Sequence, residues 1–206
     1  MKKRLLLIGL VLSLLLTMLV PGTAVAHSRI QRCPPTPFSA LAEVAVVDPG
    51  TSTSYGPYGL TIVTRGEKIQ GQFVYADGWD SMLGATLGVR HNSIIRLTPT
   101  TPESGTFAGS AWAIIVVNLS GDGGRLFGTY RATLTGDYQI TEGGIIFNNV
   151  VDSGQFTVVG RDGGNFVTAS GNWMATLLFT EVEPGIFTLA GGAEVAGEYQ
   201  TASYYW

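Results

Sequence analysis

The sequence predicts an all-β protein: a single antiparallel β-barrel of about eight to ten strands, with a two-sheet β-sandwich as the alternative. Apolar and polar residues alternate in steps of two along most of the chain, which is typical of strands with one face on a core. Glycine, with 28 of 206 residues, clusters in short turns between these runs. No stretch after residue 26 shows the period of a helix. Only 13% of the residues are charged and 45% are hydrophobic, which excludes a coiled coil and a disordered chain.

Residues 1–26 have the layout of a secretory signal peptide. Met1–Arg4 is basic, residues 5–20 form an apolar run, and Ala24–Ala26 offers the small residues that a signal peptidase recognises. The alternative is an uncleaved anchor, but the apolar run is shorter than the roughly 20 residues that span a bilayer. We therefore expect cleavage before His27 and a protein that is secreted or exposed on the exterior of the cell envelope, with no stable membrane insertion.

The charge balance of the mature chain excludes nucleic acid as a partner. The first 26 residues hold three of the 12 Lys and Arg and none of the 15 acidic residues, so the mature chain carries nine basic and 15 acidic residues. Its net charge is then about −6, and the arginines do not cluster. The neutralisation of phosphates that drives nucleic-acid binding is missing. An acidic surface suits a soluble protein outside the cell.

Residues 27–54 differ in composition from the rest of the chain. Cys33–Pro37 is a proline-rich extended segment, and residues 39–47 alternate loosely, as a possible first strand does. The lone Cys33 cannot form a disulfide within the chain, so it is either free or joins two chains as a disulfide-linked dimer. Turn residues follow at 48–50 and 56–57. The composition places the β-barrel domain at 55–206.

The period of two is strongest in the second half of the chain. Residues 130–140 and 167–179 each place an apolar stripe on one face and Thr, Ser, Asn or charged residues on the other. Shorter stripes run through 69–75 and 193–199, and 113–117 is apolar on both faces. The first of the two long stripes comprises Tyr130, Ala132, Leu134, Gly136, Tyr138 and Ile140. The second comprises Val167, Ala169, Gly171, Trp173, Ala175, Leu177 and Phe179.

Glycine turns separate these segments, as hairpins require. They lie at 77–78, 121–124, 142–144, 162–164, 184–185 and 191–192. Because the late strands are long and carry glycine on the apolar face, they favour a closed barrel. Closure bends strands strongly and removes exposed edges.

Residues 158–171, with the sequence Val-Val-Gly-Arg-Asp-Gly-Gly-Asn-Phe-Val-Thr-Ala-Ser-Gly, resemble the glycine–aromatic–small–glycine signature of dirigent and allene oxide cyclase-like β-barrels. Residues 105–110 carry a shorter version. The resemblance implies an eight-stranded antiparallel barrel with an apolar cavity. No position matches that family's catalytic acid or arginine residues, so the resemblance implies the fold and not the chemistry.

The sequence shows no constellation typical of catalysis, so a protein that is not an enzyme is the favoured interpretation. The mature chain has two histidines, His27 and His91, and no strained Gly-x-Ser-x-Gly turn before a helix. We interpret His91 as a turn or surface residue and not as a catalytic base. Two histidines and one cysteine far apart do not form a zinc site, and we expect neither a metal nor a cofactor.

One local cluster combines acids with an aromatic residue. Asp77 and Asp80 flank Trp79 beside a glycine, an arrangement that could bind calcium or offer an aromatic platform to a sugar. The alternative is a hairpin turn whose tryptophan folds back onto the sheet. We name Asp77, Trp79 and Asp80 as the candidate ligand-binding residues.

Three functions remain open. The first is a secreted, non-catalytic barrel that binds a small apolar or amphipathic ligand, or a cell-surface or carbohydrate partner. The second is a cyclase or isomerase that holds an apolar substrate in its cavity and uses one buried charge. The third is a structural component of the envelope or matrix. A buried charge separates the first two, and the candidates for it are Arg65, Glu67, Arg90 and Arg96.

Overall fold

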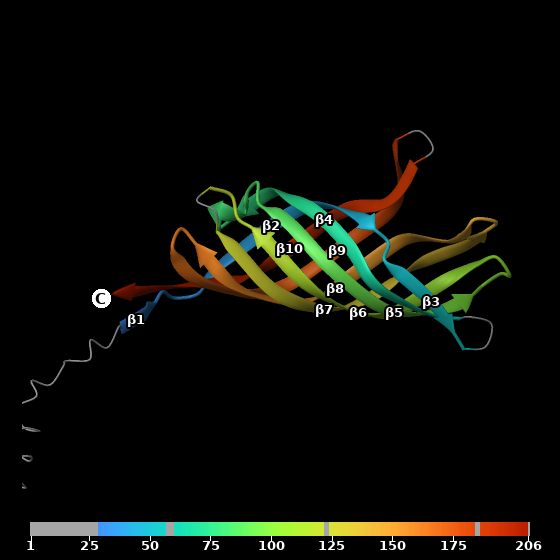
Figure 1. Ribbon diagram of the computed structural model, residues 1–206, viewed down its shortest axis with the longest axis horizontal. Helices are drawn as coiled ribbons and strands as arrows, with labels where there is room; N and C mark the ends of the chain where they lie inside the picture. Colours follow the sequence, from blue (N-terminus) through green and yellow to red (C-terminus); the bar gives the residue numbers. More distant parts are fainter. Residues whose placement is uncertain (1–28, 57–59, 122–123, 184–185, 206) are drawn as a thin grey trace, which may run out of the picture. The chain divides into compact units, whose positions relative to one another are not determined.

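The computed structural model describes residues 29–56, 60–121, 124–183 and 186–205 (Figure 1). The predicted signal peptide and its cleavage site before His27 lie outside the described residues. The chain divides into two units, Arg32–Ser203 and a unit of residues 1–31 with 204–206. The strand β1 (Arg29–Arg32) falls almost entirely in the second unit. The barrel belongs to Arg32–Ser203.

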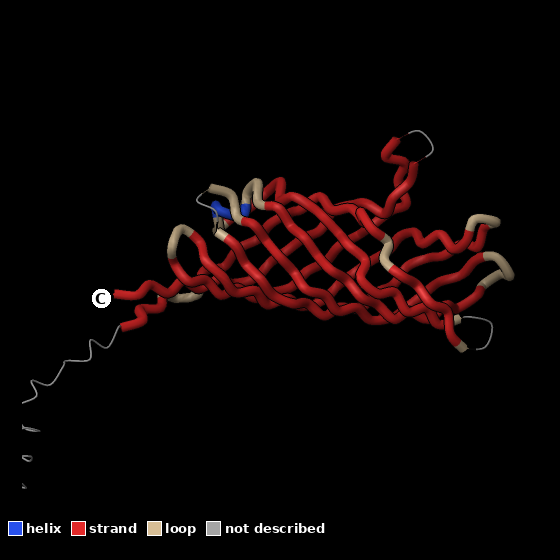
Figure 2. The backbone as a smooth tube through the Cα atoms, in the orientation of Figure 1, coloured by secondary structure: helices blue, strands red, loops and turns tan. Residues whose placement is uncertain are grey.

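Eight antiparallel strands close into a ring. The elements after β1 are β2 (Thr36–Asp48), β3 (Thr51–Tyr55), β4 (Thr61–Asp77), the short 3₁₀ helix η2 (Asp80–Met82), β5 (Thr86–Pro99), β6 (Ser104–Asn118), β7 (Arg125–Thr141), β8 (Gly144–Asp162), β9 (Asn165–Glu183) and β10 (Ile186–Tyr205). The order in the sheet is β10-β2-β4-β5-β6-β7-β8-β9, and β9 pairs with β10 to complete the ring, while β3 extends the pairing of β4. The predicted antiparallel barrel is confirmed, and the sandwich alternative is wrong (Figure 2).

The barrel begins earlier than the composition suggests. The strand β2 pairs with β4 on one side and with β10 on the other, so that Val44 lies between Gly71 and Gly191. The start near Tyr55 is therefore corrected to Thr36. The composition changes at Pro49 and Gly50 because the chain turns there from β2 into β3, and not because a domain starts. Cys33 is exposed and free in this chain, and the disulfide-linked dimer stays a prediction.

The predicted apolar stripes form the core of the barrel, as the side chains of Val167, Trp173 and Leu177 illustrate. The stripes end sooner than predicted. Ile140 lies past the last register pair with β6, and Phe179 lies past the last pair with β8. Both side chains are therefore exposed.

A β-bulge interrupts the predicted apolar stripe through residues 69–75. The register between β2 and β4 shifts by one residue next to Leu41, because Leu41 faces Tyr75 whereas Ala42 faces Phe73. One extra residue on β4, Val74, is accommodated there, so Val74 and Tyr75 are both exposed while Phe73 is buried.

Glycine at inward positions lets the strands coil tightly enough to close the ring. A Cβ atom at Gly128 would lie 1.9 Å from the carbonyl oxygen of Thr157 on β8. At Gly171 it would lie 2.1 Å from the carbonyl oxygen of Ala196 on β10. Adjacent strands therefore approach each other at these points in a way that only a residue without a side chain permits.

Candidate functional site

Four ionisable side chains meet inside the barrel and form what we call the interior cluster: Glu67, His91, Tyr130 and Asp152. They come from four strands, β4, β5, β7 and β8. The last three follow the alternation of their strands. Glu67 reaches the interior because a bulge between residues 65 and 67, with Gly66 at a φ of 72°, resets the phase of β4.

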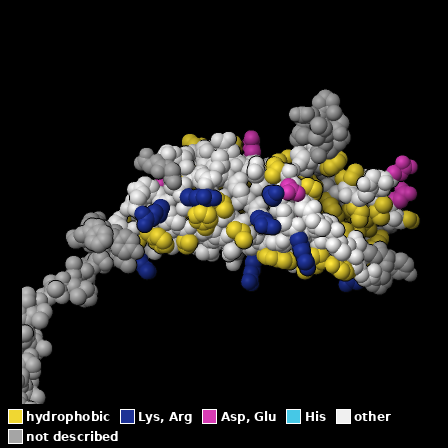
Figure 3. All heavy atoms as spheres, viewed as in Figure 1, with side chains coloured by type: hydrophobic (Ala, Val, Ile, Leu, Met, Phe, Trp, Pro, Cys, Tyr) yellow, Lys and Arg dark blue, Asp and Glu magenta, His cyan; other side chains and the backbone are white. Residues whose placement is uncertain are grey.

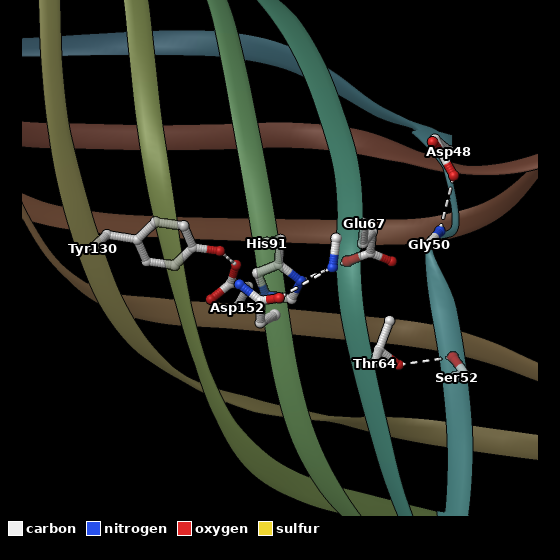
Figure 4. Close-up of polar contacts among 10 residues, drawn as sticks. Asp48, Gly50, Ser52, Thr64, Glu67, His91, Tyr130 and Asp152 are labelled. Carbon is white, nitrogen blue, oxygen red and sulfur yellow. Dashed lines mark hydrogen bonds and ion pairs between the residues drawn. The ribbon is translucent and has the colours of Figure 1, made fainter.

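The interior cluster contains two strong polar contacts (Figure 4). The Nδ1 atom of His91 lies 2.5 Å from Oε2 of Glu67, and the Tyr130 hydroxyl donates to Oδ2 of Asp152 at 2.6 Å. The His91 and Tyr130 rings stack with centroids 6.1 Å apart. His91 and Asp152 are both 3% exposed, whereas the Glu67 side chain is 21% exposed. The contact between Tyr130 and Asp152 is therefore buried, and the one between His91 and Glu67 is partly buried.

Three buried polar atoms in this region lack a hydrogen-bond partner: Nε2 of His91, Oδ1 of Asp152 and Nε1 of Trp173. Buried polar groups are normally paired, and ordered water often fills that role. The apolar half of the barrel leaves a cavity of about 30 Å³ with Trp79 and Trp173 in its lining. That volume is far below the roughly 300–1,000 Å³ of a small-molecule site, so it does not suit an apolar ligand.

Burial governs the protonation of the interior cluster. Desolvation raises the pKa of Asp152 above its usual 3.8, although the hydrogen bond from Tyr130 and the charge of His91 act in the opposite direction. Desolvation likewise raises the pKa of Tyr130 well above 10, and the Asp152 carboxylate raises it further. Tyr130 therefore keeps its proton and serves as the donor to Asp152.

We expect Asp152→Asn to stabilise the fold at neutral pH. Because its folded-state pKa is raised, the native chain binds the Asp152 proton more tightly than the unfolded chain does. This contribution to stability is fully present below the usual pKa of 3.8 and is lost as pH rises through the folded-state pKa. Asn keeps an acceptor for the Tyr130 hydroxyl without the buried charge. Melting temperatures should be measured from pH 4 to 8. The melting temperature of Asp152→Asn minus that of the wild type should increase as pH rises.

The exposed Asp77 provides the matched control for that experiment. Asp77→Asn should leave the pH dependence of the melting temperature as it is in the wild type. If Asp152→Asn also leaves it unchanged, the assignment of a raised pKa to Asp152 is incorrect.

A second polar site lies on the outside of the barrel. A groove with a volume of about 420 Å³ runs over β7, β8 and β9. The polar residues of its lining point outward. The floor of the groove is formed by Gly171 and by two residues whose aromatic side chains point inward, Tyr130 and Phe156. The polar lining residues are Thr129, Arg131, Gln155, Thr157, Ser170 and Asn172. We call this the outer groove.

The structure corrects the interpretation of Trp79 as an exposed platform. Trp79 is 3% exposed, stacks on Tyr199 with centroids 4.4 Å apart, and donates its indole N–H to Oδ2 of Asp162 at 2.8 Å. It closes one end of the barrel beside η2. Asp77 and Asp80 remain exposed, but the tryptophan between them faces the core.

Of the four candidate buried charges, only Glu67 belongs to the interior cluster. Arg65, Arg90 and Arg96 are exposed on the outer wall. The interpretation of His91 as a turn or surface residue is wrong, because the side chain is buried in the middle of a continuous strand.

Sequence reasoning also missed Asp152, although a usable signal is present in the chain. Val89, His91, Ser93 and Ile95 alternate on one face of β5, and all four are buried. Asp152 stands in the same phase as its buried neighbours on β8. Extending the period-two rule through the polar residues would have placed both side chains inside.

Two negative findings apply to the described residues alone. No group of three or more His, Cys, Asp or Glu side chains among them is arranged to hold a metal ion. No helix in the described parts of the chain has the length and apolar character needed to cross a membrane.

Comparison with known proteins finds a likeness only among solved structures. No protein-family model matches the chain, and no curated protein matches it. The attachment invasion locus protein Ail of Yersinia pestis is 8% identical and aligns over 81% of this chain and 97% of its own, with a TM-score of 0.19. Neisserial surface protein A is 10% identical over 83% and 98%, with a TM-score of 0.18. Values this low carry no inference about what this chain binds or does.

Proposed function

We propose that this chain is an exported, water-soluble β-barrel that acts by binding a polar partner on its outer wall. The observation that carries the proposal is the direction of the two faces of the strands. The inward face is apolar apart from the interior cluster. The outward face carries a polar groove and many charged or hydrogen-bonding side chains, together with exposed apolar ones such as Ile94, Ile114 and Phe127. A filled interior leaves the outer wall as the surface on which binding takes place.

The outer wall carries charged and hydrogen-bonding groups on most strands of the ring. On the face drawn in Figure 3, Lys and Arg side chains lie among other polar groups and beside hydrophobic areas. Examples from seven strands are Lys68, Gln70, Gln72, Arg90, Asn92, Arg96, Ser110, Thr129, Arg131, Thr133, Gln155, Thr157, Ser170, Asn172 and Glu194. Barrels that span a bilayer show the reverse pattern, with an apolar band toward lipid and a polar interior, and a Lys or Arg at the bilayer midplane costs them about 2–4 kcal/mol. These side chains favour contact with water.

A secreted or envelope-exterior location agrees with this polarity, and it rests on the predicted signal peptide. The second candidate, a cyclase or isomerase, is favoured by the interior cluster, whose histidine lies between two carboxylates. It requires a substrate to reach the buried Nε2 atom of His91 past the apolar packing. Binding on the outer wall requires no such opening and is the simpler function.

We expect the mature chain, produced from His27 onward without detergent, to be monodisperse in aqueous buffer. It should stay in the supernatant when it is centrifuged with phospholipid vesicles, because its outward arginines disfavour insertion. A requirement for detergent, or recovery with the vesicles, would contradict the proposal. A fluorescent apolar probe should show no enhancement with the folded chain, whereas strong enhancement would favour binding in the interior.

A further inference from the structure

A row of planar side chains crosses the outer wall from β5 to β9. Asn92 pairs in register with Trp112, Trp112 with Arg131, Arg131 with Gln155, and Gln155 with Asn172. Side chains directly opposite on neighbouring strands stand about 5 Å apart. The last three members of this row line the outer groove, and Trp112, which is 44% exposed, stands next to it.

A second row of hydroxyl groups runs parallel to the first. Thr129 pairs with Thr157, and Thr157 with Ser170. These three residues also line the outer groove. The groove therefore presents hydroxyls along one side and amides with a guanidinium along the other.

The polar groups of the outer groove are available to a ligand. Within the described chain, none of its six polar side chains forms a hydrogen bond or an ion pair with another protein group. Amides offer both donors and acceptors, and a guanidinium offers a fixed fork of donors. A volume near 420 Å³ falls in the range of about 300–1,000 Å³ that is usual for small-molecule sites.

The two ends of the groove carry charges of opposite sign. Arg131 is the one charged residue in the lining. Arg90 lies two strands beyond Thr129 along the line of the hydroxyl row, because Arg90 pairs with Ile114, which pairs with Thr129. At the opposite edge, Glu198 pairs with Ser170. An anionic group is therefore favoured at the Arg131 end and disfavoured at the β10 end.

We propose that the outer groove binds an oligosaccharide that contains an acidic sugar. Adjacent sugar hydroxyls match the amides of Gln155 and Asn172, the apolar face of a pyranose ring matches the indole of Trp112, and the sugar carboxylate matches the fork of Arg131. The inference rests on the proposed function and names the ligand class of the outer wall. An extended acidic peptide would also satisfy Arg131, so polyglutamate serves as the competing ligand in the test below.

Calorimetric titration of the mature chain with three acidic oligosaccharides tests the proposal: fragments of polygalacturonate, alginate and hyaluronan, each with its methyl ester. At least one acid form should bind more tightly than its ester, and the difference should shrink as salt is added. Trp112→Ala and Gln155→Ala should each weaken binding by about tenfold or more. Arg131→Gln should remove the preference for the acid over the ester while ester binding persists.

Gln70→Ala is the matched control for Gln155→Ala, because Gln70 is an exposed outward glutamine on β4, away from the groove. It should leave binding unchanged, and all four variants should melt as the wild type does. Binding by none of the acid forms, unchanged binding in the groove variants, or equal binding of polyglutamate would each overturn the proposal. If the chain stays in the supernatant of the vesicle experiment but fails these titrations, the oligosaccharide ligand is refuted. The proposal of a water-soluble barrel then still stands.

Discussion

Trp79→Ala is expected to destabilise the barrel by about 3–5 kcal/mol, as truncation of a buried aromatic residue does. The indole is 3% exposed and packs edge-on against Phe38 with centroids 5.2 Å apart. Its removal also leaves the carboxylate of Asp162 without the indole N–H donor. For a domain of this size the melting temperature should fall by roughly 6–20 °C, which thermal unfolding monitored by circular dichroism can measure.

Two further tryptophans calibrate that loss. Trp173→Ala removes another core indole, 7% exposed, and should cost a comparable amount. Trp112→Ala removes a side chain that is 44% exposed and should cost less than about 0.5 kcal/mol. If Trp79→Ala behaves like Trp112→Ala, then Trp79 is exposed in solution, and the cluster with Asp77 and Asp80 regains its place as a candidate platform.

The sequence could predict the strands and most of the inward face because alternation survives wherever a strand is regular. It could not predict which residues break that alternation. The bulge at Gly66 turns Glu67 inward, and the bulge at Val74 turns Tyr75 outward. A bulge is set by pairing with a neighbouring strand, so no local pattern reveals it.

The placement of His91, Trp79 and the outer groove was not predicted from the sequence, for other reasons. His91 stands between Arg90 and Asn92, and three polar residues in a row read as a turn until the strand on either side is taken into account. Trp79 depends on a partner, Asp162, that is 83 residues away. The outer groove depends on the register of three strands. Long-range pairing decides the last two, and a local period of two does not show which distant residues meet. His91 follows the period of its strand, and only its polar neighbours concealed it.

The second large effect is expected at a glycine. In Gly128→Ala the new methyl group would lie 1.9 Å from the Thr157 carbonyl oxygen and 2.6 Å from the Cα atom of Val158. Both are backbone atoms, which cannot rotate away as a side chain can. The strands β7 and β8 must separate where they pair, so the cost should reach or exceed the upper end of the roughly 1–3 kcal/mol that overpacking usually brings.

Gly192→Ala is the matched control for Gly128→Ala. Gly192 also lies within a barrel strand, but no heavy atom comes within 4 Å of the position of its Cβ. Its substitution should be neutral or stabilise the chain by up to about 1 kcal/mol, because alanine reduces the freedom of the unfolded backbone. Denaturant unfolding of both variants therefore separates steric closure of the ring from a general effect of losing glycine. Equal small losses would show that β7 and β8 can part without strain, and tight coiling at Gly128 would then not be what closes the barrel.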